Sequence, residues 1–383
     1  MSKQPPSQPS PSSELMILVR EGRLFDLQRW IGERKPLRFG ESNRSVVLRA
    51  AIETGFHSMV ETMLKAATWS PEELGDALRI CLYPRRPALA ELVINAGASF
   101  QAVDFGDVCM TMNASLMKRF LHEGGDPAKD NAFARALSDY KAKPLLGFYR
   151  EMRGEYPVLN SQAALALYQA VDERNLRWTS LLVWAGADPL LPVPYGLDDK
   201  WGETESMTTA ADQACWLADD RFFKAMRLKP TKEQALEFCR SVAFKPTVAK
   251  FEMLLRGFSA EDLNQGERRS CRFLEDLVGD REMRFSWSPP DSEEDTHRIQ
   301  CIEFLLDRGA RWNPSDEGIR EARRGLATHK GLYVVQVIRL LLYTAGASDV
   351  HVVWEVCRTE KLKSLILLAD SELWEELKTL RKN

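Results

Sequence analysis

The chain has 383 residues, of which 52 are Lys or Arg and 55 are Asp or Glu, for a formal net charge of −3. This balance gives no electrostatic reason to expect nucleic-acid binding, because contacts with phosphates require concentrated Lys and Arg. Hydrophobic residues make up 44% of the chain, yet no stretch approaches the roughly 20 consecutive apolar residues of a membrane-spanning helix. We therefore expect a soluble cytoplasmic protein that binds neither nucleic acid nor membrane.

The chain begins with a polar segment of low complexity. Residues 1–13 read MSKQPPSQPSPSS and contain no apolar run. Such a segment cannot bury enough apolar surface to offset the entropy lost on ordering. It also lacks the apolar stretch of about 7 to 15 residues that a secretory signal peptide needs. We predict a disordered tail over residues 1–13.

Two apolar stretches follow, and each is divided by one glycine. Residues 15–31 read LMILVREGRLFDLQRWI around Gly22, and residues 46–64 read VVLRAAIETGFHSMVETML around Gly55. Both patterns predict two short helices joined by a glycine turn. Helices this short are marginal alone in water, and their apolar residues lie on more than one face. Each pair should therefore stack against neighbouring pairs.

Five further apolar helices end at a glycine, as in residues 301–314, CIEFLLDRGARWNP. Glycine takes the left-handed conformation after a helix without steric cost. Two separations between these glycines, of 62 and 123 residues, are about two and four multiples of 31. A fixed period of this size is typical of stacked repeats. The glycine stops are Gly97, Gly124, Gly186, Gly309 and Gly346.

The order of helix, glycine turn, helix and Leu-Leu-x-x-Ala-Gly-Ala-Asp ending resembles the ankyrin repeat. The residues that carry the resemblance are Gly22 to Ile31, Leu181 to Pro189 and Cys301 to Asn313. It implies an all-α fold, an ankyrin-like helix-turn-helix repeat solenoid with about eleven degenerate repeats over residues 14–368. The expected copies begin near residues 15, 46, 76, 105, 131, 162, 208, 234, 270, 318 and 351.

The chain departs from the family at the opening of its repeats. The Thr-Pro-Leu-His-x-Ala motif, which hydrogen-bonds neighbouring turns, is missing apart from a faint echo at Thr209 to Ala214. Repeat boundaries are therefore least defined at 131–157 and 208–230. A generic helical solenoid is the alternative.

Two insertions, residues 191–206 and 279–296, break the period and contain aromatic residues in polar surroundings. Such aromatics either pack back onto the repeats or contact a partner, where Trp and Tyr dominate binding energy. The sequence leaves both readings open. The candidate partner-binding residues are Tyr195 and Trp201 in the first insertion and Phe285 and Trp287 in the second.

The seven cysteines are scattered through apolar helical patterns, about one in each repeat. No Cys-x-x-Cys pair is present, so neither a zinc ribbon nor a redox pair is indicated. We expect all seven to be buried thiols. Phe100 and Trp312 follow glycine turns and are expected in the core. The cysteines are Cys81, Cys109, Cys215, Cys239, Cys271, Cys301 and Cys357.

No phosphate-binding, zinc-protease or nucleophile-elbow motif occurs. Glu293, Glu294, Asp295 and His297 could ligate a metal, but a mobile acidic loop lacks mutually oriented ligands. We interpret this segment as a solvated acidic loop. The sequence therefore predicts no catalytic residue, no metal site and no cofactor.

The C-terminal segment, residues 369–383, reads ADSELWEELKTLRKN. Its apolar residues recur every three or four positions, as on one face of a helix. A terminal repeat needs one face for the preceding repeat and one for water. We predict a capping helix with Leu373, Trp374, Leu377 and Leu380 on its inner face.

Repeats without catalytic motifs favour a non-enzymatic protein–protein interaction module or scaffold. Its partner would be another protein, docked on the concave face implied by the resemblance and on the two insertions. One alternative is a regulatory or sensor subunit of an enzyme complex. A less favoured one is a metal-dependent hydrolase with a site near residues 293–297. The sequence reveals neither the partner's identity nor the oligomeric state.

Overall fold

The computed structural model describes residues 11–37, 46–83, 85–197, 207–217, 219–265, 270–279, 292–343 and 349–382. Within these ranges the chain forms 24 α-helices and no β-strand, which confirms the predicted all-α class. The chain divides into two compact units. Unit 1 comprises residues 1–170 and 180–207, and unit 2 comprises residues 171–179 and 208–383.

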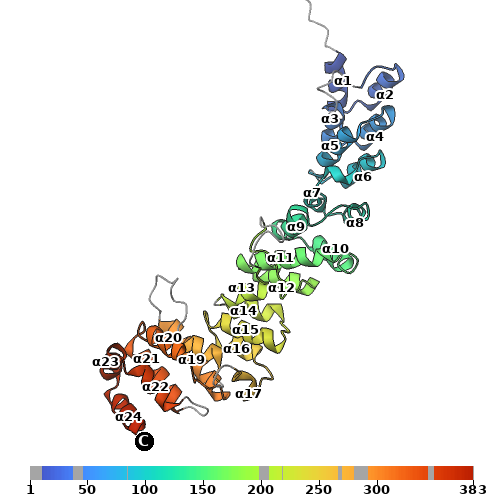
Figure 1. Ribbon diagram of the computed structural model, residues 1–383. Coiled ribbons are helices and arrows are strands. Elements are labelled where there is room, and N and C mark those ends of the chain that lie inside the picture. The colour runs from blue at the N-terminus through green and yellow to red at the C-terminus, as the bar shows by residue number, and fades with distance from the viewer. Residues whose placement is uncertain are drawn as a thin grey trace, which may run out of the picture. The chain divides into compact units, whose positions relative to one another are not determined.

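Unit 1 is built from successive pairs of short helices (Figure 1). Two 3₁₀ turns, η2 (Phe100–Ala102) and η3 (Lys129–Asn131), lie in connections between pairs. Helices α11 (Val158–Asp172) and α12 (Leu176–Ala185) contribute residues to both units. The pairs are α1 (Pro11–Arg20) with α2 (Leu24–Gly32), α3 (Val46–Thr54) with α4 (His57–Ala66), α5 (Pro71–Leu82) with α6 (Pro87–Asn95), α7 (Phe105–Met110) with α8 (Ala114–His122), and α9 (Ala132–Tyr140) with α10 (Lys143–Met152).

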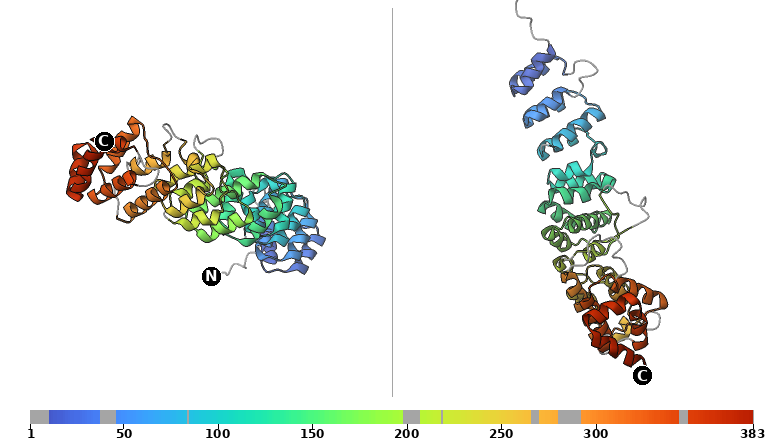
Figure 2. Two further views of the ribbon diagram at one scale, coloured as in Figure 1. Left: turned by 90° about the horizontal axis from the view of Figure 1, so that it is seen from below. Right: turned by 90° about the vertical axis from the view of Figure 1, so that its left-hand side faces the viewer.

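Neighbouring pairs in unit 1 contact each other through equivalent helices. The first helices form one series, in which α1 contacts α3, α3 contacts α5, α5 contacts α7 and α7 contacts α9. Among the second helices, α2 contacts α4, α4 contacts α6 and α8 contacts α10. Figures 1 and 2 show these pairs following one another in chain order. Each helix therefore meets both its own partner and the next pair.

Unit 2 repeats this arrangement. The first helices α13, α15, α18, α20, α22 and α24 contact one another in that order, as do the second helices α14, α16, α19, α21 and α23. The short helix α17 (Ala260–Leu263) lies between two pairs in the chain. The bounds are α13 (Ala210–Cys215), α14 (Asp220–Met226), α15 (Lys232–Val242), α16 (Val248–Leu254), α18 (Arg272–Gly279), α19 (Ser292–Asp307), α20 (Asp316–Leu326), α21 (Gly331–Tyr343), α22 (Val350–Cys357), α23 (Glu360–Ala369) and α24 (Ser371–Lys382).

Each predicted unit start lies within five residues of the first residue of a first helix. The largest difference is at α5, which begins at Pro71 where the sequence suggested residue 76. Here the Ser70 hydroxyl accepts a hydrogen bond from the Glu73 amide, and the Glu73 carboxylate accepts one from the Ser70 amide, which forms a capping box with Pro71 at the first helical position. Serine before the helix, proline at its first position and glutamate at its third fix a helix start. That local signal explains the earlier boundary.

The turn between the two helices of a pair contains a residue in the left-handed conformation in six consecutive pairs. Glycine fills this place only in the first two, at Gly22 and Gly55, with φ of 68° and 80°. Larger residues fill it in the next four, with φ between 47° and 56°: Arg85, Met112, Lys141 and Arg174. The fold therefore repeats a backbone geometry that the sequence marks only in part.

The predicted glycine stops also adopt positive φ after their helices. The angles are 105° at Gly97, 83° at Gly124, 101° at Gly186 and 84° at Gly309, which confirms these four positions. Gly346 lies outside the described residues. A fifth stop, Gly257 with φ of 84°, follows α16 and was not singled out in the sequence, because its upstream helix is short and carries charged residues.

Cationic side chains join neighbouring pairs by donating to main-chain carbonyls at helix ends. In unit 1, Arg153 donates to the carbonyl of Gly186 at 3.0 Å. In unit 2, Arg308 donates to the carbonyl of Leu255 at 3.0 Å. The last carbonyls of a helix lack intrahelical donors and carry partial negative charge. A cation from a neighbouring pair therefore satisfies them and fixes where the pairs meet.

The core lies between the helices of successive pairs. All seven cysteines are free and buried there, as the sequence predicted. Phe100 is 3% exposed and Trp312 fully buried, which confirms both as core residues. Burial raises the pKa of every thiol above 9.0, to about 12 at Cys81, Cys215, Cys301 and Cys357.

The sequence predicts a disordered tail at the N-terminus and a capping helix at the C-terminus. Helix α1 begins at Pro11, three residues inside the predicted tail, and residues 1–10 lie outside the described residues. Helix α24 contacts α22 and α23. Its inner face buries Leu373, Trp374 and Leu377, and Leu380 is half-buried. The Trp374 ring lies 5.3 Å from that of Trp354 in α22.

Candidate functional site

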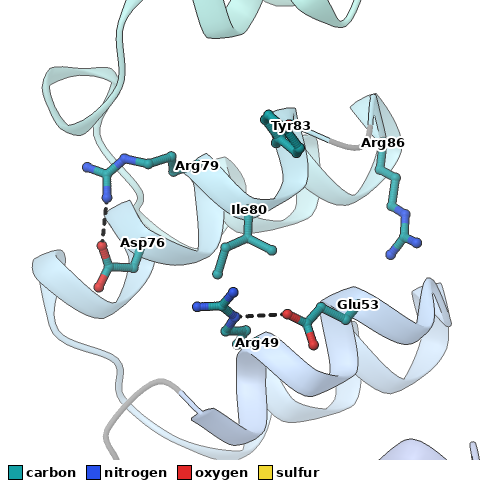
Figure 3. A pocket seen from close by; sticks show the side chains of 7 residues that line it. All are labelled: Arg49, Glu53, Asp76, Arg79, Ile80, Tyr83 and Arg86. Atoms are coloured by element: carbon teal, nitrogen blue, oxygen red, sulfur yellow. Dashed lines mark hydrogen bonds and ion pairs between the residues drawn. The ribbon is translucent and has the colours of Figure 1, made fainter.

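A groove of about 580 Å³ lies in unit 1, between helices α3 and α5. We call it the α3–α5 groove (Figure 3). Its lining combines three guanidinium groups, two carboxylates, one aliphatic side chain and one phenol. The lining residues are Arg49, Glu53, Asp76, Arg79, Ile80, Tyr83 and Arg86.

Helical periodicity places these side chains on one face of each helix. Arg49 and Glu53 are four residues apart on α3, and Asp76, Arg79 and Tyr83 recur at three- and four-residue spacing along α5. Residues with these spacings are neighbours on a helix surface. The opposite face of each helix is buried in the core. The groove is therefore the solvent side of two adjacent first helices.

Each helix carries one ion pair within the groove. On α3, Arg49 Nε donates to Glu53 Oε1 at 2.8 Å, and on α5, Arg79 Nη1 donates to Asp76 Oδ1 at 3.0 Å. All four side chains are more than half exposed. Exposed pairs of this kind contribute little to stability, because water and salt screen them. These charges remain available to a ligand that offers better partners.

Arg86 is held differently from the other two arginines. It precedes α6, and its side chain reaches toward α3, where a guanidinium nitrogen donates to the carbonyl oxygen of Ile52. Ile52 lies in the last turn of α3, so the cation caps the negative end of that helix. The acceptor is a neutral main-chain group. Because this carbonyl is neutral, the contact with Ile52 leaves the positive charge of Arg86 in the groove.

The middle of the groove is apolar. Ile80 lies between the two ion pairs, and Tyr83 projects from the end of α5 (Figure 3). Ile80 is partly exposed, and Tyr83 is 76% exposed. A tyrosine ring so exposed can bury much apolar area on contact while its hydroxyl keeps a hydrogen bond. The groove therefore offers an aromatic and an aliphatic contact between charged groups.

Apart from Arg86, the charged groups of the groove are already paired with one another. Both of its carboxylates accept hydrogen bonds from arginines, and its lining contains no cysteine, histidine, serine or lysine to act as nucleophile or base. Throughout the described ranges, no group of three or more His, Cys, Asp or Glu is arranged to hold a metal ion. Nor does the described part contain a helix long and apolar enough to cross a bilayer.

Of the four aromatic residues predicted from the insertions, only Tyr195 is described. It is 53% exposed, so about half of its surface faces solvent. The start of its insertion is nevertheless anchored to unit 1: the carbonyl of Leu197 accepts hydrogen bonds from Asn131 at 2.9 Å and Arg135 at 3.0 Å. Trp201, Phe285 and Trp287 lie outside the described residues.

The interpretation of residues 289–298 as a solvated acidic loop is wrong from residue 292 onward, because α19 begins there. Asp295 is buried and lies 2.8 Å from Nδ1 of His329, which is also buried. Glu294 lies 3.5 Å from the Lys245 ammonium, and His297 is exposed. Asp295 and His297 therefore do not converge on one site. Asp295 instead ties α19 to the end of α20.

Sequence reasoning missed the α3–α5 groove. One signal was present: each helix alternates a buried apolar face with oppositely charged residues at three- or four-residue spacing. Such a face is usually only solvated. What makes it a groove is that Arg49 and Tyr83, 34 positions apart, line one cavity, and no local pattern reveals that.

Comparisons with known proteins add no further identification. The chain matches no protein-family model, and no curated protein is significantly similar to it.

Proposed function

We propose that this chain is a divergent ankyrin-like repeat protein that binds another protein and performs no catalysis. In the described part of the chain, eleven helix pairs precede α24, and their first helices begin within five residues of the expected repeat starts, which supports the proposal. Within each unit, first helices contact first helices and second helices contact second helices. This arrangement supports a solenoid of stacked repeats.

The family's opening motif is absent, yet the pairs have another means of joining. Arginine and lysine side chains donate to helix-end carbonyls of neighbouring pairs, as Arg153 does to Gly186 and Lys250 to Leu217. These bonds take the place that hydrogen bonds between neighbouring turns would occupy. The seven free thiols favour a reducing compartment such as the cytoplasm.

The α3–α5 groove carries the functional proposal. It presents Tyr83, Ile80 and three arginines: Arg49 and Arg79 on the solvent side of two adjacent first helices, and Arg86 from the turn before α6. Tyr and Arg are enriched among the residues that dominate protein interfaces. A surface made by consecutive helix pairs can extend along a partner. Tyr195, at the anchored start of the first insertion, supplies a second exposed aromatic contact in the same unit.

The proposal is tested by crosslinking the full chain to its partners in extracts of its source organism. Proteins captured by the wild type are quantified by mass spectrometry against the Tyr83→Ala variant. Phe25→Ala is the matched control, because Phe25 is 81% exposed on α2 and does not line the groove. A partner lost with Tyr83→Ala and retained with Phe25→Ala supports the proposal. Capture of no protein above the level of bare resin contradicts it.

The contribution of the first insertion is measured with the double variant Tyr195→Ala, Trp201→Ala. If both rings contact the partner, binding should weaken by about 2 kcal/mol or more. The melting temperature should change little, because more than half of Tyr195 is already exposed to solvent. Unchanged affinity would restrict the binding surface to the helix faces.

A further inference from the structure

We propose that the α3–α5 groove binds an acidic segment of the partner, one that carries an apolar side chain beside its carboxylates. This inference rests on the proposed function, because it names the kind of partner that the same site accepts. It follows from the charges, the apolar middle and the shape of the groove.

The lining of the groove contains one more positive than negative charge. Arg49 is paired with Glu53 and Arg79 with Asp76. Arg79 also donates to the carbonyl of Ala102 at 2.8 Å, and the third cation, Arg86, donates to the carbonyl of Ile52. Arginine presents five N–H donors in a planar fork. A guanidinium bound to one carbonyl therefore keeps donors for an incoming carboxylate. Charge complementarity favours an acidic ligand over a basic one.

A second feature selects for an apolar neighbour of that carboxylate. Ile80 lies between the two ion pairs, beside the exposed ring of Tyr83 (Figure 3). An apolar side chain placed over Ile80 would remove both groups from water, which is the dominant source of binding energy. A free phosphate or acetate ion would meet the arginines but leave these contacts unused.

The dimensions of the groove suit a short stretch of chain. Its volume of about 580 Å³ is several times that of one side chain. The ion pairs lie on two different helices, so carboxylates on both sides of the apolar residue can each meet an arginine. Exchange of an intramolecular carboxylate for one from the partner costs little, because the exposed pairs are weak.

The test selects peptides of about twelve residues from a random display library against the full chain. Enriched sequences should place Asp or Glu next to Leu, Ile, Phe or Tyr. One enriched peptide is then synthesised with a fluorescent label, and its Kd is measured by anisotropy. We expect Tyr83→Ala to raise the Kd about tenfold and Tyr83→Phe to leave it nearly unchanged. Phe25→Ala is again the matched control and should have no effect.

The charge is tested separately with Arg86→Gln. Glutamine keeps an N–H donor for the Ile52 carbonyl but removes the positive charge. The Kd should rise about tenfold, and its dependence on sodium chloride should become shallower than in the wild type. A circular dichroism melt of each variant shows whether the fold is retained. If Arg86→Gln unfolds, Arg86→Lys with retained affinity supports the role of the charge.

The outcomes separate this inference from the proposed function. Enrichment of basic peptides, enrichment of none, or affinities insensitive to Tyr83 and Arg86 overturn the acidic-segment proposal. If the crosslinking experiment still captures a partner in those cases, the binding function stands and a different surface carries it. If no partner is captured and no peptide is enriched, both proposals fail.

Discussion

The two units fill the space between their helices with different chemistry. In unit 1, the ring of Phe105 lies 4.8 Å from that of Phe120, 5.7 Å from Phe133 and 5.9 Å from Phe148. These rings come from the four consecutive helices α7 to α10. Among the described residues of unit 1, the one buried charged side chain is Glu73, in its capping box.

Unit 2 buries several charged or titratable polar groups instead: Lys250, Asp295, Arg298 and His329. The Lys250 ammonium donates to the carbonyls of Leu217 at 2.6 Å, and of Cys215 and Lys245 at 3.1 Å. Burial lowers the pKa of Lys250, and the charge of Asp220 opposes that shift. Arg298 donates to the carbonyl of Leu277 at 3.2 Å.

Divergent repeats can therefore stack in two ways, by apolar packing or by directed hydrogen bonds from buried charged groups. Apolar rings attract any apolar neighbour, so contact depends on fit rather than direction. A buried ammonium must meet specific acceptors, because an unpaired one is very costly. The aromatic cluster of unit 1 therefore depends on the volume of its side chains, whereas the buried ammonium of unit 2 depends on defined carbonyls. The experiments below test that distinction, from the largest expected effect to the smallest.

The largest effect is expected at the aromatic cluster of unit 1. Phe133→Ala removes a fully buried ring and should lower the free energy of unfolding by about 4 kcal/mol. Phe133→Leu keeps most of the volume and should cost less than half as much. Urea titration followed by circular dichroism measures both. An equal decrease in the free energy of unfolding of the two variants would show that side-chain volume alone does not account for the stability of this cluster.

Replacement of Lys250 by methionine tests the carbonyl contacts of unit 2. Methionine is similar in length but cannot donate, so three carbonyls lose a hydrogen bond to a charged group. We expect a loss of about 3 kcal/mol in urea titration. The exposed lysine of α14, in Lys224→Met, is the control and should change stability by less than about 0.5 kcal/mol. An unchanged or higher stability of Lys250→Met would mean that burial of the charge is a net cost.

From the positions of the cysteines we predict that the stability of unit 2 falls more than that of unit 1 at high pH. It holds Cys215, Cys239, Cys271, Cys301 and Cys357, whereas unit 1 holds Cys81 and Cys109. Burial raises the pKa of these thiols, so between pH 9 and about 12 the native state keeps protons that the unfolded state loses. Their stability contribution is complete below pH 9 and is lost as the pH rises through that window.

Each buried thiol should add a slope of about −1.4 kcal/mol per pH unit above pH 9. The slope is obtained from urea titrations at several pH values for the wild type and for Cys357→Ala. The variant should lose one thiol's share of the slope, whatever its cavity costs at neutral pH. Identical slopes in the two proteins would contradict the assignment of Cys357 as a buried thiol.

The smallest effect concerns the left-handed turns of unit 1. Lys141 has φ of 47°, in the place that Gly55 occupies in an earlier pair. Lys141→Gly should raise stability by roughly 0.5 kcal/mol, because relief of strain outweighs the added freedom of the unfolded chain. Gly55→Ala should lower it by about 1 kcal/mol. Melting temperatures that shift in the same direction would contradict an equivalent turn geometry.

Local chemistry made much of the fold readable in the sequence. Helix ends are marked by glycines at 97, 124, 186 and 309. The cap at Ser70 and Pro71 marks the start of α5, although the predicted start was residue 76. The sequence did not indicate four left-handed turns, because their residues rarely adopt positive φ without the surrounding structure. These turns are at Arg85, Met112, Lys141 and Arg174. Asp295 was misread for a similar reason: its buried partner, His329, is 34 residues away.

The sequence by itself determined the all-α class, the positions of the helix pairs and the burial of the cysteines. Each of these depends on spacing within about one turn or one pair, where neighbours in the chain are neighbours in space. Only the tertiary structure decided that α3 and α5 present Arg49, Ile80 and Tyr83 to one groove. It also decided that Lys250 meets the carbonyls of Cys215 and Leu217. Those contacts join residues distant in the chain, and their partners are main-chain atoms or exposed faces that leave no pattern in the sequence.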